Sequence, residues 1–132
     1  MMLVKTKLGP SRIHGLGLFA AEFIQKGKPV WEFTKGLDLR FTEEELQKLP
    51  ELARENILHY CYHDIADGAY VLCFDDGRFF NHSENPNVGD IEVPGREQEV
   101  FAALHDIQVG EELTCNYREF DIDCREGLES YC

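Results

Sequence analysis

Long apolar runs are missing from this chain, in which no apolar stretch exceeds a few residues. A helix that crosses a membrane needs about 20 consecutive apolar residues, so no segment is expected to span a bilayer. The first residues, Met1 to Lys7, also lack the apolar core of a secretory signal peptide. We therefore expect a protein of the cytosol, or of the nucleus if its source is a eukaryote.

Basic residues are scarce. The chain has 13 Lys and Arg against 25 Asp and Glu, and its formal net charge is −12. Binding along a nucleic-acid backbone requires a basic surface, so no direct contact with nucleic acid is expected. An acidic surface attracts cationic partners such as a Lys-rich peptide, although it also serves solubility alone.

Closely spaced cysteine pairs are absent as well. In a chain without an export signal, scattered cysteines predict free thiols. Residues 59–63 read His-Tyr-Cys-Tyr-His and place three potential metal ligands at alternating positions. Because no second cluster lies at zinc-site spacing, we expect a half-buried aromatic wall there and no metal. The cysteines are Cys61, Cys73, Cys115, Cys124 and Cys132.

The segments that are present predict many short strands. An apolar content of 43% in 132 residues fits one domain with a core of its own. The turn Lys26-Gly27-Lys28-Pro29 predicts a hairpin between the second and third strands, and residues 89–98 are expected to form a loop. The expected strands are Val4–Lys7 (ended by Gly9-Pro10), Leu18–Ile24, Val30–Phe33, Ala69–Asp75, Glu99–Leu104 and Glu112–Tyr117.

Two short helices are expected between these strands. Thr42 followed by three glutamates is a capping box, which predicts a helix over about 43–49. Residues Glu51–Leu58 lack strand alternation and carry a helical apolar stripe. The fold class is therefore mostly β, an α+β arrangement with few short helices.

A glycine-rich segment lies near the start of the chain. Residues 15–20 read Gly-Leu-Gly-Leu-Phe-Ala, which matches the dinucleotide-binding fingerprint as text. That fingerprint needs a strand before it and a full helix after it. Here Pro10 precedes it, and Gly27 and Pro29 follow within about ten residues. We reject a Rossmann fold, but two glycines around one residue still let backbone approach a ligand closely, or form a plain turn.

Two further segments carry polar and aromatic signals. Residues 78–87 read Arg-Phe-Phe-Asn-His-Ser-Glu-Asn-Pro-Asn, which places three hydrogen-bonding side chains directly behind an apolar pair. Residues 109–117 read Val-Gly-Glu-Glu-Leu-Thr-Cys-Asn-Tyr. Taken alone, the first is a surface turn and the second a packing strand.

Taken in order, the three segments resemble the SET-domain family of protein lysine methyltransferases. Its hallmarks are an early G-x-G, a central R-F-x-N-H-S-x-x-P-N, and a late G-E-E-L-x-x-x-Y preceded by an I-x-x-G turn. The likeness runs from Val4 to about Phe120. It implies a SET-domain fold of several small sheets with a knot-like C-terminal threading. One SET domain would then fill residues 1–132, with a short tail from about 118.

The resemblance implies S-adenosylmethionine as cofactor and a protein lysine, in a cationic segment, as methyl acceptor. Tyr117 is the implied catalytic residue, where cofactor and lysine meet. The implied cofactor contacts are His14, Gly15, Leu16, Gly17, Arg78, Phe79, Asn81, His82 and Tyr117. The implied lining of the substrate channel is Tyr60, Tyr62, Tyr70, Cys115 and Phe120.

The chain departs from many family members around its expected lysine channel. Glu84 stands where a cysteine often follows the N-H-S motif, and the tail lacks a C-x-C cluster. Zinc is therefore not expected. The tail, with Phe120 and Tyr131 as candidates, or a second subunit would close the channel, which leaves a homodimer open. Because flanking substrate-recognition segments are missing, the chain resembles the small stand-alone SET proteins of bacteria and some viruses.

Three questions stay open at this stage. Cys115 replaces an aromatic residue that limits methyl number in many members, so mono-, di- and trimethylation all remain open. A SET-like module that binds without turnover is one alternative function, although the presence of Tyr117 argues against it. A methyltransferase acting on a small-molecule amine is the other, because tertiary structure sets the channel walls.

Overall fold

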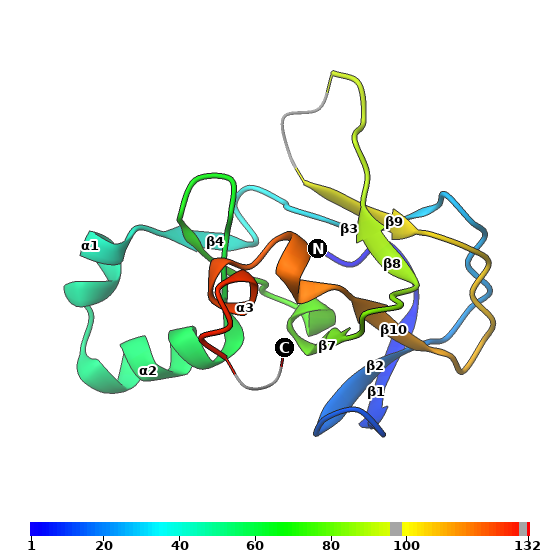
Figure 1. Cartoon of the computed structure of the whole chain (residues 1–132), viewed down its shortest axis with the longest axis horizontal. Coiled ribbons are helices and arrows are strands. Elements are labelled where there is room, and N and C mark those ends of the chain that lie inside the picture. The colour runs from blue at the N-terminus through cyan, green and yellow to red at the C-terminus, as the bar shows by residue number, and fades with distance from the viewer. Residues whose placement is uncertain (96–98, 130–131) are drawn as a thin grey trace.

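The computed structural model describes residues 1–95, 99–129 and 132. Its short strands form three small sheets, and the helices of residues 43–47 and 51–60 lie at one end of the molecule (Figure 1). The strands are β1 (Thr6–Pro10), β2 (Leu16–Ala20), β3 (Pro29–Glu32), β4 (Leu39–Phe41), β5 (Tyr62–His63), β6 (Tyr70–Leu72), β7 (Asn81–His82), β8 (Val88–Asp90), β9 (Val100–Ala103) and β10 (Glu112–Cys115). The helices are α1 (Glu43–Gln47), α2 (Glu51–Tyr60) and α3 (Ile122–Arg125), with 3₁₀ helices η1 (Asp76–Phe79) and η2 (Tyr117–Glu119).

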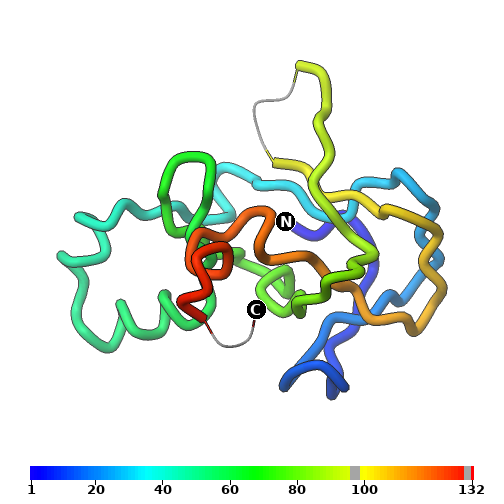
Figure 2. Tube along the Cα trace, in the orientation of Figure 1, coloured from blue at the N-terminus to red at the C-terminus, as the bar shows by residue number. Residues whose placement is uncertain are grey.

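The sheet orders are β1-β2-β10-β7, β3-β9-β8 and β4-β6-β5. The pairing of β10 with β7 is parallel, with Thr114 opposite Asn81 and Cys115 opposite His82. Parallel neighbours need a long connection between them, which here includes β8 and β9. In Figure 2 the green segment near residue 81 and the orange segment near residue 114 meet at the centre of the trace.

The expected hairpin across residues 26–29 is wrong. β2 pairs with β1 and β10, whereas β3 pairs with β9 in another sheet. Ile24 is fully buried and pairs with Ile107 instead, through hydrogen bonds of 3.0 and 2.8 Å. The two turns that follow these isoleucines end in Gly27 and Gly110, with φ of 83° and 89°. Residues 24–27 and 107–110 therefore use the same turn chemistry, and the two segments pair with each other.

Other element boundaries differ from expectation for local reasons. β1 continues through Pro10, and the missing backbone N–H of this proline is tolerated because β1 is an edge strand. The loop expected over residues 89–98 begins later, because Gly89 and Asp90 pair with β9; residues 96–98 lie outside the described part. β10 ends at Cys115, and Tyr117 begins η2 rather than ending a strand.

Both expected helices are confirmed. The amide of Glu45 donates to Thr42 Oγ1 at 3.2 Å, and the amide of Thr42 donates to Glu45 Oε2 at 2.8 Å. These two bonds complete the capping box of α1. α1 ends at Gln47, earlier than expected, because Pro50 begins the next helix. α2 then runs to Tyr60, two residues beyond the expected end.

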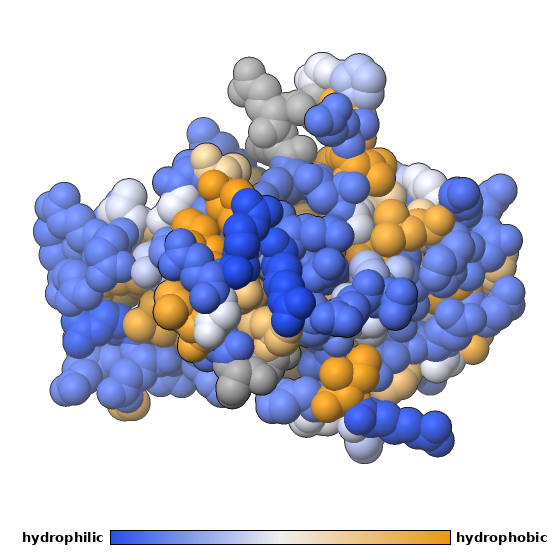
Figure 3. All heavy atoms as spheres, viewed as in Figure 1, coloured by the Kyte–Doolittle hydropathy of each residue, from blue (hydrophilic) through white to orange (hydrophobic). Residues whose placement is uncertain are grey.

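The core lies where the sheets meet. Leu18, Leu113 and Val88 are fully buried members of one apolar cluster, and the rings of Trp31 and Phe101 pack edge to face at 5.8 Å. Hydrophilic residues cover most of the face shown in Figure 3, in keeping with the net charge of −12. No helix among the described residues has the length and apolar character needed to cross a membrane.

The expectation of five free thiols is wrong for one pair, because Cys124 and Cys132 form a disulfide. Asp121 caps α3 by accepting from the amide of Cys124 at 3.1 Å. The chain reverses at Gly127, whose φ is 70°, and the amide of Leu128 returns to the carbonyl of Asp123 at 2.8 Å. This reversal brings the two sulfurs together. The remaining cysteines are free: Cys61, Cys73 and Cys115.

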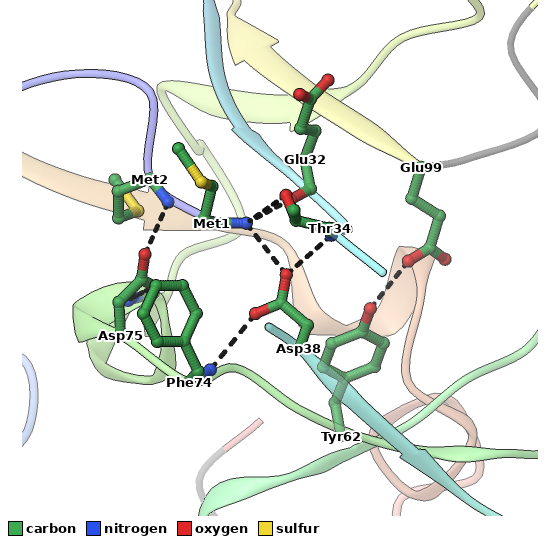
Figure 4. A network of polar contacts seen from close by, with 10 residues as sticks. Met1, Met2, Glu32, Thr34, Asp38, Tyr62, Phe74, Asp75 and Glu99 are labelled. Atoms are coloured by element: carbon green, nitrogen blue, oxygen red, sulfur yellow. Dashed lines mark hydrogen bonds and ion pairs between the residues drawn. The ribbon is translucent and has the colours of Figure 1, made fainter. Parts of the chain in front are cut away.

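A buried carboxylate joins the first residues of the chain to the loops beside η1 (Figure 4). The Asp38 side chain is fully buried and accepts from the amide of Thr34 at 2.8 Å, the amide of Phe74 at 3.2 Å and the amino group of Met1 at 2.9 Å. Nearby, Asp75 accepts from the amide of Met2 at 2.8 Å. Asp38 is therefore a polar anchor for three segments.

Asp38→Asn should destabilise the fold, because an amide offers one acceptor oxygen where the carboxylate offers two. We expect a loss of about 2 kcal/mol in the free energy of unfolding, measured by denaturant titration. Glu44→Gln makes the same chemical change on the surface of α1 and should leave the transition midpoint nearly unchanged. Equal effects of the two variants would contradict the anchoring role.

Candidate active site

A cavity of about 610 Å³ is lined by residues from the early, middle and late parts of the chain. Its walls come from the turn before β2, the end of α2, the η1–β7 segment and the residues after β10. The lining is mostly apolar and aromatic, with a few polar groups, which is typical of pockets for small ligands. The volume lies within the usual range of such pockets.

The cavity brings together most of the residues that the sequence pointed to. Those expected at the cofactor that line it are His14, Gly15, Leu16, Arg78, Phe79, Asn81, His82 and Tyr117. Those expected at the substrate channel that line it are Tyr60, Tyr62, Cys115 and Phe120.

Three expected site residues lie elsewhere or outside the description. Gly17 is not among the cavity-lining residues; a Cβ there would lie 2.2 Å from Glu112 Oε1, so its role is to let that carboxylate approach. Tyr70 stacks flat on His63 at 4.4 Å and is also not among them. Tyr131 lies outside the described residues.

Asn81 holds the walls together through its side-chain amide. Nδ2 donates to the carbonyls of His14 and Leu16, both at 3.1 Å, and to Glu112 Oε1 at 2.8 Å. The same carboxylate accepts from Ser11 Oγ at 2.7 Å. The Asn81–Glu112 pair thereby fixes the backbone of the glycine turn against the edge of the cavity.

His82 and Tyr117 are fixed against each other. The amide of Tyr117 donates to His82 Nδ1 at 3.2 Å, so the neutral ring carries its proton on Nε2. Burial, with the nearby charge of Arg118, holds the pKa of His82 below its ordinary value, so the ring stays neutral at neutral pH. The Tyr117 hydroxyl donates to the carbonyl of Phe80.

Two of the cavity-lining residues carry a buried ring N–H group. Within the described part of the chain, Trp31 Nε1 and His82 Nε2 have no hydrogen-bond partner. Buried donors are rarely left unpaired in folded proteins. Both residues line the cavity, so a ligand with acceptor oxygens or nitrogens fits this lining.

Aromatic rings form one wall of the cavity. Phe120 packs edge to face against Tyr62 at 5.1 Å, against Phe101 at 5.3 Å and against Tyr117 at 5.8 Å. On another side, the guanidinium of Arg78 lies 5.4 Å from the centre of the Tyr60 ring. The cavity is thus bounded by rings that suit an alkyl chain or an alkylammonium group.

The thiols at the cavity are not nucleophiles. Burial raises the pKa of Cys61 and that of Cys73 to about 12, and it raises the pKa of Cys115 as well. A thiol reacts as its thiolate, so these cysteines act as small apolar lining. Among the described residues, no three His, Cys, Asp or Glu side chains are grouped to hold a metal.

Comparison with known families identifies this arrangement. The model of the SET domain matches residues 15–118. The chain belongs to the SET-domain family. The matched range begins at the glycine turn and ends just after Tyr117, so it includes all three motifs that line the cavity.

Named relatives agree with this assignment. The H3 lysine-4 specific histone-lysine N-methyltransferase of Schizosaccharomyces pombe is 37% identical over 115 residues, which cover 83% of this chain and 12% of the relative. Histone-lysine N-methyltransferase ATX2 of Arabidopsis thaliana is 32% identical over 139 residues, covering 94% of this chain and 12% of the relative. This SET domain thus spans only about an eighth of their length.

A solved structure confirms the expected SET fold. Polycomb repressive complex 2 of Chaetomium thermophilum, in an autoinhibited conformation bound to S-adenosylmethionine, aligns with a TM-score of 0.66 and 27% identity. The match covers 95% of this chain and 16% of that chain. Mostly short strands in several small sheets are therefore confirmed, and the knot-like threading stays a prediction.

Sequence reasoning missed several residues of this SET domain that shape the cavity, among them Glu112 and Trp31. Glu112 was seen only as part of the late motif, and Trp31 only as part of a strand. The signal for Glu112 was a carboxylate at the start of a strand whose next three residues are apolar or small. Nothing local marked Trp31, because its exposure to the cavity depends on Gly77, where a Cβ would lie 3.0 Å from its indole nitrogen.

Glu112→Ala should loosen this SET domain, because it leaves the Asn81 amide and the Ser11 hydroxyl without their carboxylate acceptor. We expect a loss of about 2–3 kcal/mol in the free energy of unfolding, measured by denaturant titration. Glu111→Ala is the matched control, since that neighbouring side chain is exposed. Similar losses from both variants would show that the carboxylate does not hold the motifs together.

Proposed function

We propose that this SET domain transfers the methyl group of S-adenosylmethionine to the side-chain amine of a lysine in a protein. The supporting observation is that one cavity is lined by the glycine turn, by Asn81 and His82, by Tyr117 and by a wall of aromatic rings. The part of the cavity lined by aromatic rings fits the four methylenes of a lysine side chain. The part with polar groups fits the nucleoside and amino-acid portions of S-adenosylmethionine.

The cavity passes a test of fit to this cofactor. S-adenosylmethionine carries acceptor atoms for the unpaired N–H groups of Trp31 and His82. The residues that would hold it are the backbone of His14, Gly15 and Leu16 and the segment 78–82. When bound, the cofactor supplies an activated methyl group on a positively charged sulfur.

The rest of the chemistry falls to the chain. The lysine amine must be neutral to attack, yet its ordinary pKa is about 10.4. An apolar channel disfavours the ammonium form. Alignment of the amine by the channel walls contributes a further entropic advantage. Tyr117 is positioned for this, because the carbonyl of Phe80 and the ring of His82 fix its hydroxyl and its ring.

The substrate is proposed to be a lysine in a cationic segment, such as a histone tail. Two of the relatives are named as enzymes for histone lysine, and one of these as specific for lysine 4 of histone H3. The net charge of −12 favours a cationic partner by electrostatic steering. The single-domain boundary, a homodimer, the cellular location and the number of methyl groups stay predictions.

Incubation with S-adenosylmethionine labelled in its methyl group tests the function. Purified histone H3 and a small amine, such as free lysine, are offered in parallel. We expect label in the protein, at lysine after digestion. Label in the small amine alone would favour the small-molecule alternative, and cofactor binding without any transfer would favour the binding module.

Tyr117→Phe should lower methyl transfer to histone H3 by at least about tenfold while the Kd for S-adenosylmethionine stays within a few-fold, because only one hydroxyl is lost. Initial rates and calorimetry separate the two quantities. Tyr70→Phe removes the same atom from a ring that is not among the cavity-lining residues, and should keep the rate. Transfer by Tyr117→Phe at the unchanged rate would remove Tyr117 from its assigned role.

A further inference from the structure

A tyrosine of the cavity wall is hydrogen-bonded to a carboxylate behind it. Tyr62 lines the cavity from β5, and its hydroxyl donates to Glu99 Oε2 at 2.7 Å (Figure 4). Glu99 directly precedes β9, far from Tyr62 in sequence. Because the hydroxyl proton is committed to Glu99, the lone pairs of the Tyr62 oxygen remain as acceptors.

The surroundings of Glu99 favour uptake of a proton. Burial raises the pKa of Glu99, and the charges of Asp64 and Asp90 raise it further, against the hydrogen bond from Tyr62 and the charge of Arg40. Arg40 is itself engaged by Asp64 at 2.5 Å. Glu99 therefore lies near two other carboxylates, and the Arg40 guanidinium near it is already paired with Asp64.

Tyr62 itself does not ionise in this setting. Burial, followed by the charge of Glu99, raises the pKa of Tyr62 far above its ordinary value. A proton can pass through this hydroxyl only if one arrives as another leaves. Tyr117 differs in its acceptor, since the carbonyl of Phe80 is an amide oxygen and is not protonated near neutral pH.

We propose that Tyr62 and Glu99 take up the proton that a substrate ammonium must lose before methyl transfer. The ammonium N–H bond breaks and its proton joins the Tyr62 oxygen, while the Tyr62 O–H bond breaks and its proton joins Glu99. The nitrogen keeps the electron pair with which it attacks. Glu99 ends as a neutral carboxylic acid and returns the proton to solvent after turnover. This step rests on the proposed transfer to lysine.

The pH dependence of kcat/KM for histone H3 tests the relay. Glu99→Gln should lower kcat/KM by about 100-fold at pH 7, the usual contribution of a positioned base. The deficit should shrink as the pH rises toward about 10, where the free amine becomes abundant without help. The wild type should lose activity as the pH falls and Glu99 becomes protonated. A deficit of the same size at every pH would show a structural role and overturn the proposal.

Two further variants sharpen the test. Tyr62→Phe should show the same pH-dependent deficit, and Tyr62→Phe with Glu99→Gln should be no slower than either single variant, because both act in one relay. Additive losses would overturn the relay. Glu92→Gln removes a nearby exposed carboxylate and should match the wild type at all pH values.

Calorimetry with S-adenosylmethionine and thermal unfolding accompany each variant. Unchanged Kd and Tm place the loss in the proton step. If Glu99→Gln raised the Kd for S-adenosylmethionine by the same factor by which it lowered kcat/KM, Glu99 would be needed for folding of the pocket. That result would overturn the relay. If the wild type moves no label to protein at any pH, the proposed function fails, and that outcome is distinct from failure of the relay.

Discussion

The hydrogen bonds of one amide organise this molecule. Asn81 is almost fully buried, and its Nδ2 donates to the carbonyls of His14 and Leu16 and to the Glu112 carboxylate. The amide nitrogen has two protons for these three acceptors, so both protons are used and one is shared between two acceptors. Three segments far apart in the chain meet at this point. The glycine turn supplies two carbonyls, β10 supplies the Glu112 carboxylate, and β7 supplies Asn81 itself, so these segments are held together.

A second asparagine extends the same order along β10. The side chain of Asn87 accepts from the amide of Thr114 at 2.9 Å and donates to the carbonyl of Glu112 at 2.8 Å. It therefore takes the place of a strand beside the first part of β10, ahead of the parallel pairing of β7 with Thr114 and Cys115. With both sides of β10 satisfied, the chain leaves Cys115 in a fixed direction. That direction returns Tyr117 to the carbonyl of Phe80 and the ring of His82.

Features that depend on a few neighbouring residues could be predicted from the sequence, and features that depend on distant packing could not. The capping box at Thr42 involves residues three apart, so the sequence contained the whole interaction. The expected hairpin failed because burial of Ile24 against Ile107 outweighs the local turn signal. The cavity residues were found through motif resemblance. Glu99 was missed, since its partner Tyr62 reaches it only in the folded chain.

The buried carboxylates of this acidic chain have partners inside the fold. Asp38 and Asp64 are buried and held by backbone amides or by Arg40, so their charge is satisfied inside the protein. Asp121 is buried as well and accepts from the amide of Cys124, and it also lines the cavity, as does Glu129. Burial raises the pKa of Asp121, although backbone amides oppose this shift. These two carboxylates therefore favour entry of a cationic side chain over that of an anionic one.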